Sequence, residues 1–228
     1  MLGIIGGTSL LFARLPDLEK RVVHTPYGNS EVMAGEVALL LRHQRDIPPH
    51  RINYRSHLSA LALLGVDRLV VLGSSGSLKK EIPPGSMVIP TDYFSSAAVP
   101  TLHDHAICHV HPGFSPELSN HLKEIVPEAI FGGTYVQTRG PRIETVAEVR
   151  ALALCGDIVG MTLASEATLA IELGIEVAAL CTVDNYANGL SDELLTYERI
   201  VEYSARYKDR TEEIISRIIQ ELAQEITS

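Results

Sequence analysis

The sequence predicts an α/β fold in which helices flank a central mixed β-sheet or distorted barrel. Short apolar runs alternate with longer segments of helical periodicity along the chain, which is the pattern of that fold class. Residues 22–43 have the pattern of consecutive strands joined by short turns, which disfavours a purely parallel sheet. The 228 residues suit a single domain over 1–228, with a helical C-terminal region at about 190–226.

The predicted strands are short apolar runs bounded by glycine, proline or polar residues. The first is "LGII" at 2–5, which the glycines of "GGTS" end. The others are residues 36–43, 67–73, 86–92, 134–138, 157–161 and 177–183. Ligands of such folds bind at the carboxyl ends of strands, so the residues that follow each run are the candidates for chemistry.

Four segments between these strands carry apolar residues at helical spacing. They are residues 53–65, 115–126, 144–154 and 165–174. We expect Ser115 to cap the start of the second helix and Gly174 to end the fourth. The C-terminal region has the apolar stripe and charged face of one or two amphipathic helices that pack on the body.

Composition excludes several classes of protein. A formal net charge of -9 disfavours a nucleic-acid partner, which would require a basic surface. The three cysteines are too few and too irregularly spaced for a disulfide framework or a zinc site, so we expect reduced thiols that mostly pack in the core. The chain has no apolar stretch of membrane-spanning length and no basic signal peptide, so we expect a cytoplasmic protein without a membrane partner.

Donor groups follow four of the predicted strands. Thr8 follows the first strand, Arg42 and His43 end the second, Ser74 lies in "GSSGSL" after the third, and Thr162 lies in "VGMT". Each has an ordinary alternative, such as a tight turn, a surface ion pair or a simple Gly-Ser loop. Four strand ends that carry donors in an acidic protein are better explained by one anion-binding site.

The apolar run at 177–183 is followed by Asp184 and Asn185. Buried polar side chains cost free energy unless they are hydrogen-bonded, so either the chain turns there or a polar ligand meets these groups.

Five segments in order resemble the purine nucleoside phosphorylase and methylthioadenosine phosphorylase family. They are "GIIGGTSL", "RHQRDIPPHRINYRSH", "GSSGSLKKEIPPGSMVIP", "GPRIETVAEVR" and "DIVGMTLASEATLA". The resemblance implies a nucleoside phosphorylase-like mixed sheet or distorted barrel, assembled as a homotrimer or a dimer of trimers. It implies phosphorolysis, in which inorganic phosphate replaces a purine at C1′ of a nucleoside without a metal or organic cofactor.

The resemblance also assigns site residues by motif. The phosphate-binding residues would be Thr8, Arg42, His43, Thr162 and the backbone around Ser74. The ribose would rest against Met161, and the purine would lie near Ile143 and meet the side chains of Glu144 and Asn185. Negative charge grows on the departing purine, so the Asn185 amide is the expected donor to N7. Without the motif, Glu144 would be an exposed acid at a helix N-terminus.

The identity of the base follows from the same comparison with the family. Relatives that cleave adenine nucleosides carry aspartates at the positions of Asn185 and Ala187, whereas members acting on 6-oxopurines have glutamate and asparagine at the positions of Glu144 and Asn185. Inosine, guanosine or 5′-methylthioinosine is therefore the expected substrate, in purine salvage. The alternatives are a methylthioadenosine phosphorylase, a nucleoside hydrolase of the same superfamily, or a non-catalytic nucleotide-binding module.

The sugar pocket and the subunit contact stay open at the level of sequence. Tyr197 lies where relatives contact the 5′ group of the sugar, but a core tyrosine on an amphipathic helix fits its pattern equally well. His109, in "ICHVHPGF", is expected either to reach a neighbouring subunit's active site or to be an ordinary surface or core histidine.

Overall fold

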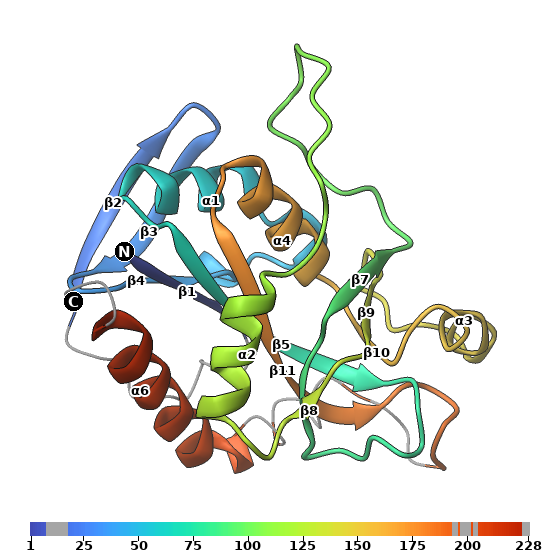
Figure 1. Cartoon of the computed structure of the whole chain (residues 1–228). Coiled ribbons are helices and arrows are strands. Elements are labelled where there is room, and N and C mark those ends of the chain that lie inside the picture. The colour runs from blue at the N-terminus through green and yellow to red at the C-terminus, as the bar shows by residue number, and fades with distance from the viewer. Residues whose placement is uncertain (8–17, 193–195, 197–201, 203–204, 225–228) are drawn as a thin grey trace.

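The computed structural model describes residues 1–7, 18–192, 196, 202 and 205–224. They form an eleven-stranded mixed sheet flanked by helices, as the sequence predicts (Figure 1). The strands are β1 (Leu2–Gly6), β2 (Glu19–Thr25), β3 (Gly28–Ala34), β4 (Ala38–Leu41), β5 (Arg68–Ser77), β6 (Met87–Ile89), β7 (Asp92–Ser95), β8 (Ile130–Phe131), β9 (Thr134–Gln137), β10 (Ile158–Gly160) and β11 (Glu176–Tyr186). The helices are α1 (Tyr54–Leu63), α2 (Pro116–Ile125), α3 (Val146–Leu152), α4 (Leu163–Glu172) and α6 (Lys208–Gln224).

Strand β5 lies at the centre of the sheet, which branches around it. The main path runs β2-β3-β4-β1-β5-β10-β9-β7, while β11 also pairs with β5 and continues the sheet through β6 to β8. β1 and β11 run parallel to β5, and β10 runs antiparallel to it. The predicted consecutive strands within 22–43 are confirmed as the antiparallel set β2, β3 and β4.

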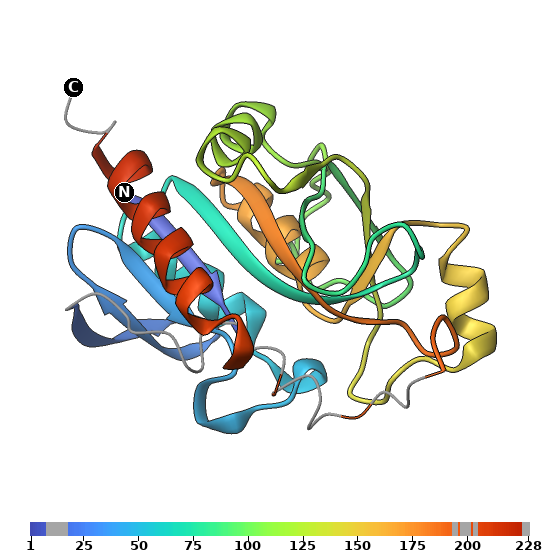
Figure 2. The same ribbon diagram turned by 90° about the horizontal axis from the view of Figure 1, so that it is seen from below.

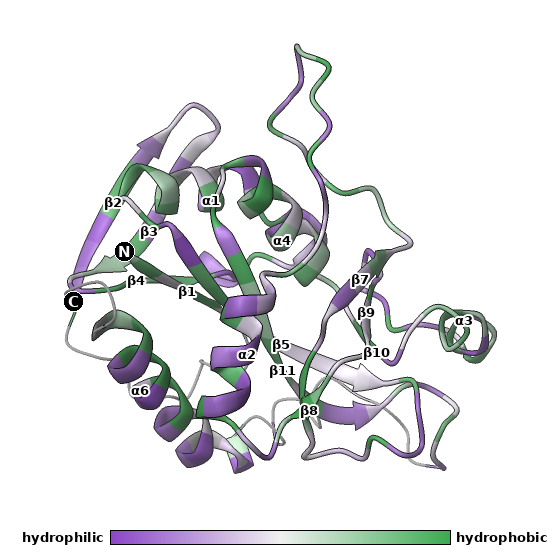
Figure 3. Cartoon of the chain, viewed as in Figure 1, coloured by the Kyte–Doolittle hydropathy of each residue, from purple (hydrophilic) through white to green (hydrophobic). Residues whose placement is uncertain are grey.

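Helices cover both faces of the central strands, so these strands are apolar on both sides (Figures 1 and 2). Leu69 and Val71 of β5 belong to the core beneath α1 and α4. Val70 and Leu72 alternate with them and belong to the core beneath α2 and α6. Figure 3 shows the resulting division on α6, where apolar and hydrophilic residues occupy different sides of the helix.

The expected helix signals are confirmed at two helix ends. The Ser115 side chain accepts a hydrogen bond from the backbone N–H of Leu118 and caps α2. Gly174 has a φ of 70°, a left-handed conformation in which glycine avoids the strain of a side chain, and it ends α4. A third signal was not predicted: Thr145 and Glu148 form a reciprocal capping box at the start of α3.

Several predicted boundaries are wrong, and most errors occur at the site. "GSSGS" continues β5 instead of forming a loop, and Asp184 and Asn185 lie inside β11, which ends at Tyr186. The third predicted helix begins at Val146, two residues late, and the fourth begins at Leu163, two residues early. Strands β7 and β8 were missed because they are short and partly exposed, and pairing with β9 and β6 defines them.

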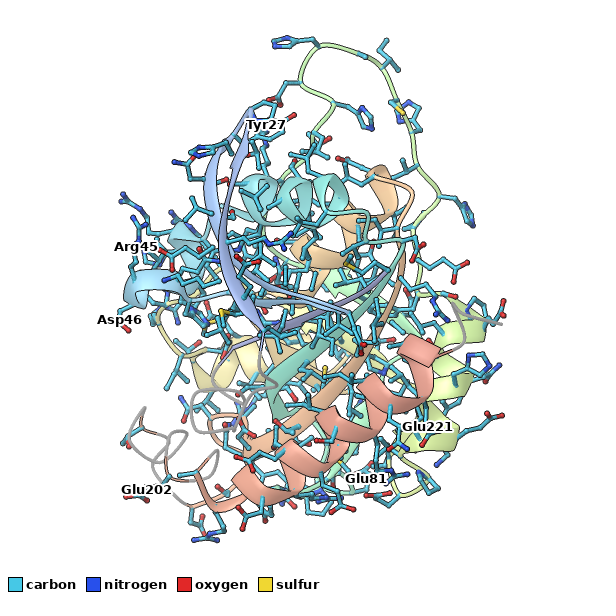
Figure 4. All side chains as sticks on the ribbon, turned by 90° about the vertical axis from the view of Figure 1, so that its left-hand side faces the viewer. Tyr27, Arg45, Asp46, Glu81, Glu202 and Glu221 are labelled. Carbon is cyan, nitrogen blue, oxygen red and sulfur yellow. The ribbon has the colours of Figure 1, made fainter. Side chains whose placement is uncertain are left out.

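Two surface features matter for the site. Residues 96–115, between β7 and α2, project from the body of the molecule (Figure 1). After β4 the chain turns sharply through Arg45 and Asp46, which both have positive φ and point outward (Figure 4).

Two expectations from composition can be compared with the structure. Of the three cysteines only Cys181 is buried, so the expectation that most pack in the core is wrong. Within the described part of the chain, no helix is both long and apolar enough to cross a bilayer.

Candidate active site

An unpaired stretch along one edge of β5 defines the candidate site. β11 pairs with β5 along its whole length, on one edge. On the other edge β1 pairs with residues 68–71 and β10 pairs with residues 76–77. Residues 72–75 therefore face no other described strand on that edge. β1 and the parallel β4 end at this stretch from one side, and β10 ends at it from the opposite side. Three of the four predicted strand ends therefore meet here, whereas the fourth, at "GSSGS", lies inside β5.

Arg42 lies at this stretch in a buried ion pair. Its Nε and Nη2 donate to the two carboxylate oxygens of Glu166 at 2.8 and 3.0 Å, and Nη2 also donates to the carbonyl oxygen of Leu72 at 3.0 Å. The two side chains are only 3% and 1% exposed, so the surface ion pair considered as an alternative is wrong. The paired nitrogens of the fork are occupied by Glu166, and Nη1 is left as the nitrogen that can meet an anion.

The guanidinium stays charged because of its partner. Burial alone would lower the pKa of Arg42, but the adjacent Glu166 raises it above its ordinary value. Burial likewise raises the pKa of Glu166, and the two hydrogen bonds from Arg42 oppose that shift. With both bonds near 3 Å, the pair is ionic.

Two histidines and a glycine lie beside the ion pair. His43 Nδ1 contacts the carbonyl oxygen of Ile47 at 2.8 Å; as the donor of this bond it directs Nε2 away from that carbonyl. A Cβ added at Gly7 would lie 2.7 Å from Arg42 Nη1 and 3.3 Å from the His43 ring, so the loop after β1 approaches both closely. Burial, with help from Arg42 and His43, lowers the pKa of His57 to about 4. Burial lowers the pKa of His43 as well, and both shifts favour neutral imidazoles, so the Arg42 guanidinium is the cation among these side chains that an anion would meet.

The end of β10 carries Met161 and Thr162 to the same place. Thr162 is the N-cap residue of α4 but makes no capping hydrogen bond, and its backbone N–H is directed to the Tyr135 hydroxyl at 3.3 Å. The Met161 side chain packs against Gly140, which has a positive φ of 61°, and a Cβ there would overlap the Met161 sulfur. Met161 therefore joins the anion-binding side of the site to the loop that carries Glu144.

Glu144 is held at the opposite end of the site. It is 8% exposed and lies before α3 rather than in its first turn, so the alternative of an exposed helix-terminal acid is wrong. One carboxylate oxygen accepts a hydrogen bond of 2.5 Å from Thr138. The Asn188 side chain donates to the Glu144 carbonyl oxygen at 3.1 Å, which ties this loop to the segment after β11.

Asn185 lies next to a break in the β5–β11 ladder. Val183 pairs with Ser75 and Asn185 pairs with Gly76, so Asp184 is an extra residue that forms a β-bulge. The Asn185 amide nitrogen donates to the carbonyl oxygen of Tyr186 at 2.9 Å. The same nitrogen would lie 2.9 Å from a Cβ at Gly76, so a side chain at that position would displace the amide from its place over β5.

Asp184 is buried, and no basic side chain among the described residues pairs with it. It is 3% exposed, and its carboxylate accepts hydrogen bonds from the hydroxyls of Ser74 on β5 and Thr182 on its own strand. Burial raises the pKa of Asp184 to about 6, although both hydroxyls act in the opposite direction. This carboxyl group changes its charge near neutral pH.

The structure brings together most of the residues expected at the site. Those placed around the unpaired stretch of β5, or tied to it by the contacts above, are Arg42, His43, Ser74, Glu144, Met161, Thr162 and Asn185. Ile143, half-buried, immediately precedes Glu144. Thr8 and Tyr197 lie outside the described residues. His109 is exposed on the projecting segment 96–115, so its own chain does not bring it to the other site residues (Figure 1).

Sequence reasoning missed Glu166 and the structural role of Asp184. Glu166 lies in "LASEATLA", so a charged residue among small apolar residues on a buried helix was the available signal. The partner of such a charge has to be buried too, and Arg42 was already a candidate. No sequence pattern indicated the bulge at Asp184.

Two further features do not contribute a ligand site. A cavity of about 20 Å³ lies between β5, β11 and α6, which is space for a water molecule but not for a nucleoside. Among the described side chains, no three His, Cys, Asp or Glu residues are grouped as ligands for a metal ion.

The chain is similar to curated proteins over nearly its whole length. The chain is 39% identical to a probable 6-oxopurine nucleoside phosphorylase of Archaeoglobus fulgidus, over 99% of this chain and 97% of that protein. It is 37% identical to a probable S-methyl-5′-thioinosine phosphorylase of Methanocaldococcus jannaschii, over 96% of this chain and 92% of that protein.

The fold is also found among solved structures. It superposes on a methylthioadenosine phosphorylase from Schistosoma mansoni in complex with adenine, with a TM-score of 0.88 and 22% identity, over 98% of this chain and 91% of that chain. The model of the phosphorylase superfamily matches residues 1–220. With nearly the whole chain matched both to this model and to relatives above 30% identity, the protein is a nucleoside phosphorylase of the phosphorylase superfamily.

Proposed function

We propose that the protein catalyses phosphorolysis of 6-oxopurine nucleosides, namely inosine, guanosine or 5′-methylthioinosine. The products are the free purine and ribose 1-phosphate or methylthioribose 1-phosphate, and the physiological role is purine salvage in the cytoplasm. The observation that carries the proposal is that one site holds two sets of groups: the donors Arg42 and His43 for an anion, and the buried Glu144 carboxylate with the Asn185 carboxamide for a base. The names of the relatives from Archaeoglobus and Methanocaldococcus support the same substrates.

Each group has a role in a dissociative displacement at C1′. Phosphate binds against Arg42 Nη1, His43, Thr162 and the backbone at Ser74, and its charge stabilises the positive sugar ring in the transition state. Burial lowers the pKa of His43, and the bound anion favours its protonated form, which donates from Nε2. The bond from C1′ to the purine breaks as the bond to a phosphate oxygen forms.

The departing purine gains negative charge, which Asn185 stabilises by donating from its amide to N7. Glu144 accepts from N1–H and, for guanine, from the exocyclic amine. Adenine has an unprotonated N1 that cannot donate to this carboxylate, so a buried charge would be left unpaired. Met161 lies between the two ends, in the position for the ribose, and Ile143 lies beside the base.

The reaction requires phosphate as co-substrate and neither a metal nor an organic cofactor in this proposal. The assembly is a homotrimer or a dimer of trimers. In that assembly the exposed His109 contacts the active site of a neighbouring subunit. This contact gives a role to segment 96–115, which projects away from the body of its own chain (Figure 1).

A phosphate-dependence assay across a panel of nucleosides tests the proposal. Inosine, guanosine, adenosine, 5′-methylthioinosine and 5′-methylthioadenosine are each incubated with and without phosphate, and base and sugar phosphate are quantified. We expect turnover of the 6-oxopurine nucleosides only with phosphate, and a kcat/KM about 10⁴-fold above that of the adenine nucleosides.

Each other outcome identifies a different enzyme. Equal kcat/KM for the two classes of base would contradict the roles of Glu144 and Asn185. Preference for 5′-methylthioadenosine would indicate a methylthioadenosine phosphorylase. Release of free ribose without phosphate would indicate a hydrolase, and binding without turnover would indicate a non-catalytic module.

A further inference from the structure

We propose that Asp184 is a positioning residue of this site, which holds Ser74 at the phosphate end and Asn185 at the purine end in a fixed relation. The inference rests on the proposed function, because Ser74 and Asn185 bind phosphate and purine only in that proposal. Asp184 itself touches neither ligand. The inference is carried by three observations: the bulge at Asp184, its hydrogen bond to Ser74, and the burial of its carboxylate between hydroxyls of two strands.

The bulge sets the direction of Asn185. Without it, pairing of Val183 with Ser75 would be followed by pairing of Asp184 with Gly76, and Asn185 would move one position along β5. With Asp184 as the extra residue, Asn185 is opposite Gly76 instead. A bulge redirects the side chains that follow it. The position of the purine donor therefore depends on Asp184 staying in the bulge.

The Asp184 carboxylate fixes the bulge to both strands. It accepts one hydrogen bond from Ser74 on β5 and one of 2.9 Å from Thr182, two residues earlier on β11. The single hydroxyl hydrogen of Thr182 is shared with the Gly73 carbonyl oxygen, 3.3 Å away, so the clamp reaches the backbone of β5. A shift of the bulge by one residue would move the Asp184 carboxylate away from the Ser74 hydroxyl that it accepts from.

The same clamp reaches the phosphate end. The Leu72 carbonyl oxygen points out of the unpaired edge of β5, where it accepts from Arg42. Backbone groups alternate between the two edges of a strand, so the N–H of Ser74 points out of the same edge and toward the proposed phosphate. The Ser74 side chain donates a hydrogen bond to Asp184, which is more deeply buried than Ser74. Asp184 thus restrains the residue whose backbone meets the anion.

A carboxyl group is a costly choice for this position. Burial of an acid without a cation costs free energy, and an apolar or amide side chain would avoid that cost. Residues that are unfavourable for stability in this way are concentrated at functional sites. The two acceptor oxygens of Asp184 serve two different strands at once, which an apolar side chain cannot do.

Steady-state kinetics of Asp184→Ala and Asp184→Asn test the inference, with Asn185→Ala as the reference for complete loss of the purine donor. We expect kcat of Asp184→Ala to fall about 10²-fold with the nucleoside KM little changed, because misplacement of a donor affects the transition state more than ground-state binding. Asp184→Asn keeps the shape and one acceptor oxygen, so we expect it to restore kcat to within about threefold of wild type. Ser216→Ala, at an exposed position on α6, is the control with unchanged kcat.

A purely structural role predicts a different pattern. Both Asp184 variants would then lose thermal stability while kcat per folded molecule stayed at the wild-type value, and that result overturns the inference. If Asp184→Ala does not fold, Ser74→Ala removes the other half of the clamp, and its unchanged kcat would overturn the inference in the same way. Wild-type protein that turns over no nucleoside overturns the proposed function as well, whereas an active wild type with unaltered variants overturns this inference alone.

Discussion

Two buried carboxylates lie in this site, and their surroundings differ. Glu166 is 1% exposed and faces a guanidinium, with hydrogen bonds of 2.8 and 3.0 Å to Arg42. Asp184 is 3% exposed, and its partners within the described part of the chain are the hydroxyls of Ser74 and Thr182. One charge is neutralised by a partner of opposite sign, while the other is stabilised by neutral dipoles alone.

The difference separates two ways to build a binding site. At the phosphate end, Glu166 is held by two hydrogen bonds from Arg42, which oppose the effect of burial on its pKa. Next to the purine end, Asp184 has a pKa of about 6 and its charge changes with small changes in pH. Removal of one partner from the Arg42–Glu166 pair should cost several kcal/mol of stability, whereas the contribution of Asp184 to stability should vary with pH.

Substitution Glu166→Gln should have the largest effect on stability. It leaves the Arg42 guanidinium buried with no opposite charge, and removal of one partner of a buried pair costs about 3–5 kcal/mol. Urea unfolding at pH 7 measures the loss. Glu19→Gln is the matched control, because Glu19 is 70% exposed in its pair with Arg21 and such pairs contribute about 0–1 kcal/mol. Equal losses for both variants would show that the buried pair contributes no more to the free energy of unfolding than the exposed pair does.

The sequence predicted the strand ends of the site better than the contacts between them. Arg42, His43 and Thr162 were identified because apolar runs end beside them, and the sheet does bring these ends to one edge of β5. The whole Arg42 guanidinium was assigned to phosphate, because its carboxylate partner, Glu166, lies 124 residues away in the sequence and was not recognised. No local pattern connects two residues at that separation.

The length of β5 could not be predicted for a related reason. "GSSGS" consists of small polar residues that have low strand propensity and commonly form loops. In the protein the segment is a strand because it pairs with residues 181–186 of β11 along its whole length. Tertiary pairing overrides local preference there, and the same pairing produces the bulge that no single segment encodes.

Substitution Asp184→Asn should change how stability depends on pH. The folded pKa of Asp184, about 6, is higher than the ordinary value of 3.8, so folding favours the protonated form. Its contribution to stability is complete below about pH 4 and is lost as the pH rises through 6. Between pH 4 and 7 the wild type should therefore lose about 3 kcal/mol relative to Asp184→Asn.

Urea unfolding of both proteins at pH 4, 5, 6 and 7 measures this difference, since all other groups titrate in both. Asp192→Asn is the control at an exposed aspartate and should follow the wild-type curve. A constant difference between wild type and Asp184→Asn across this range would show that Asp184 titrates normally, and the contrast with Glu166 would then disappear.

Substitution Thr182→Val should have the smallest effect and isolates one dipole of the Asp184 clamp. Valine keeps the shape of threonine but removes the hydroxyl that donates to Asp184 at 2.9 Å, so the variant should lose about 1 kcal/mol at pH 7. Because that hydrogen bond favours the ionised carboxylate, its loss should raise the pKa of Asp184 further, and the destabilisation should be smaller at pH 4, where the acid is protonated. Thr182→Ser retains the hydroxyl and should behave as wild type in the same urea series. A loss that is equal at pH 4 and pH 7 would mean that Thr182 acts through packing, not through the charge of Asp184.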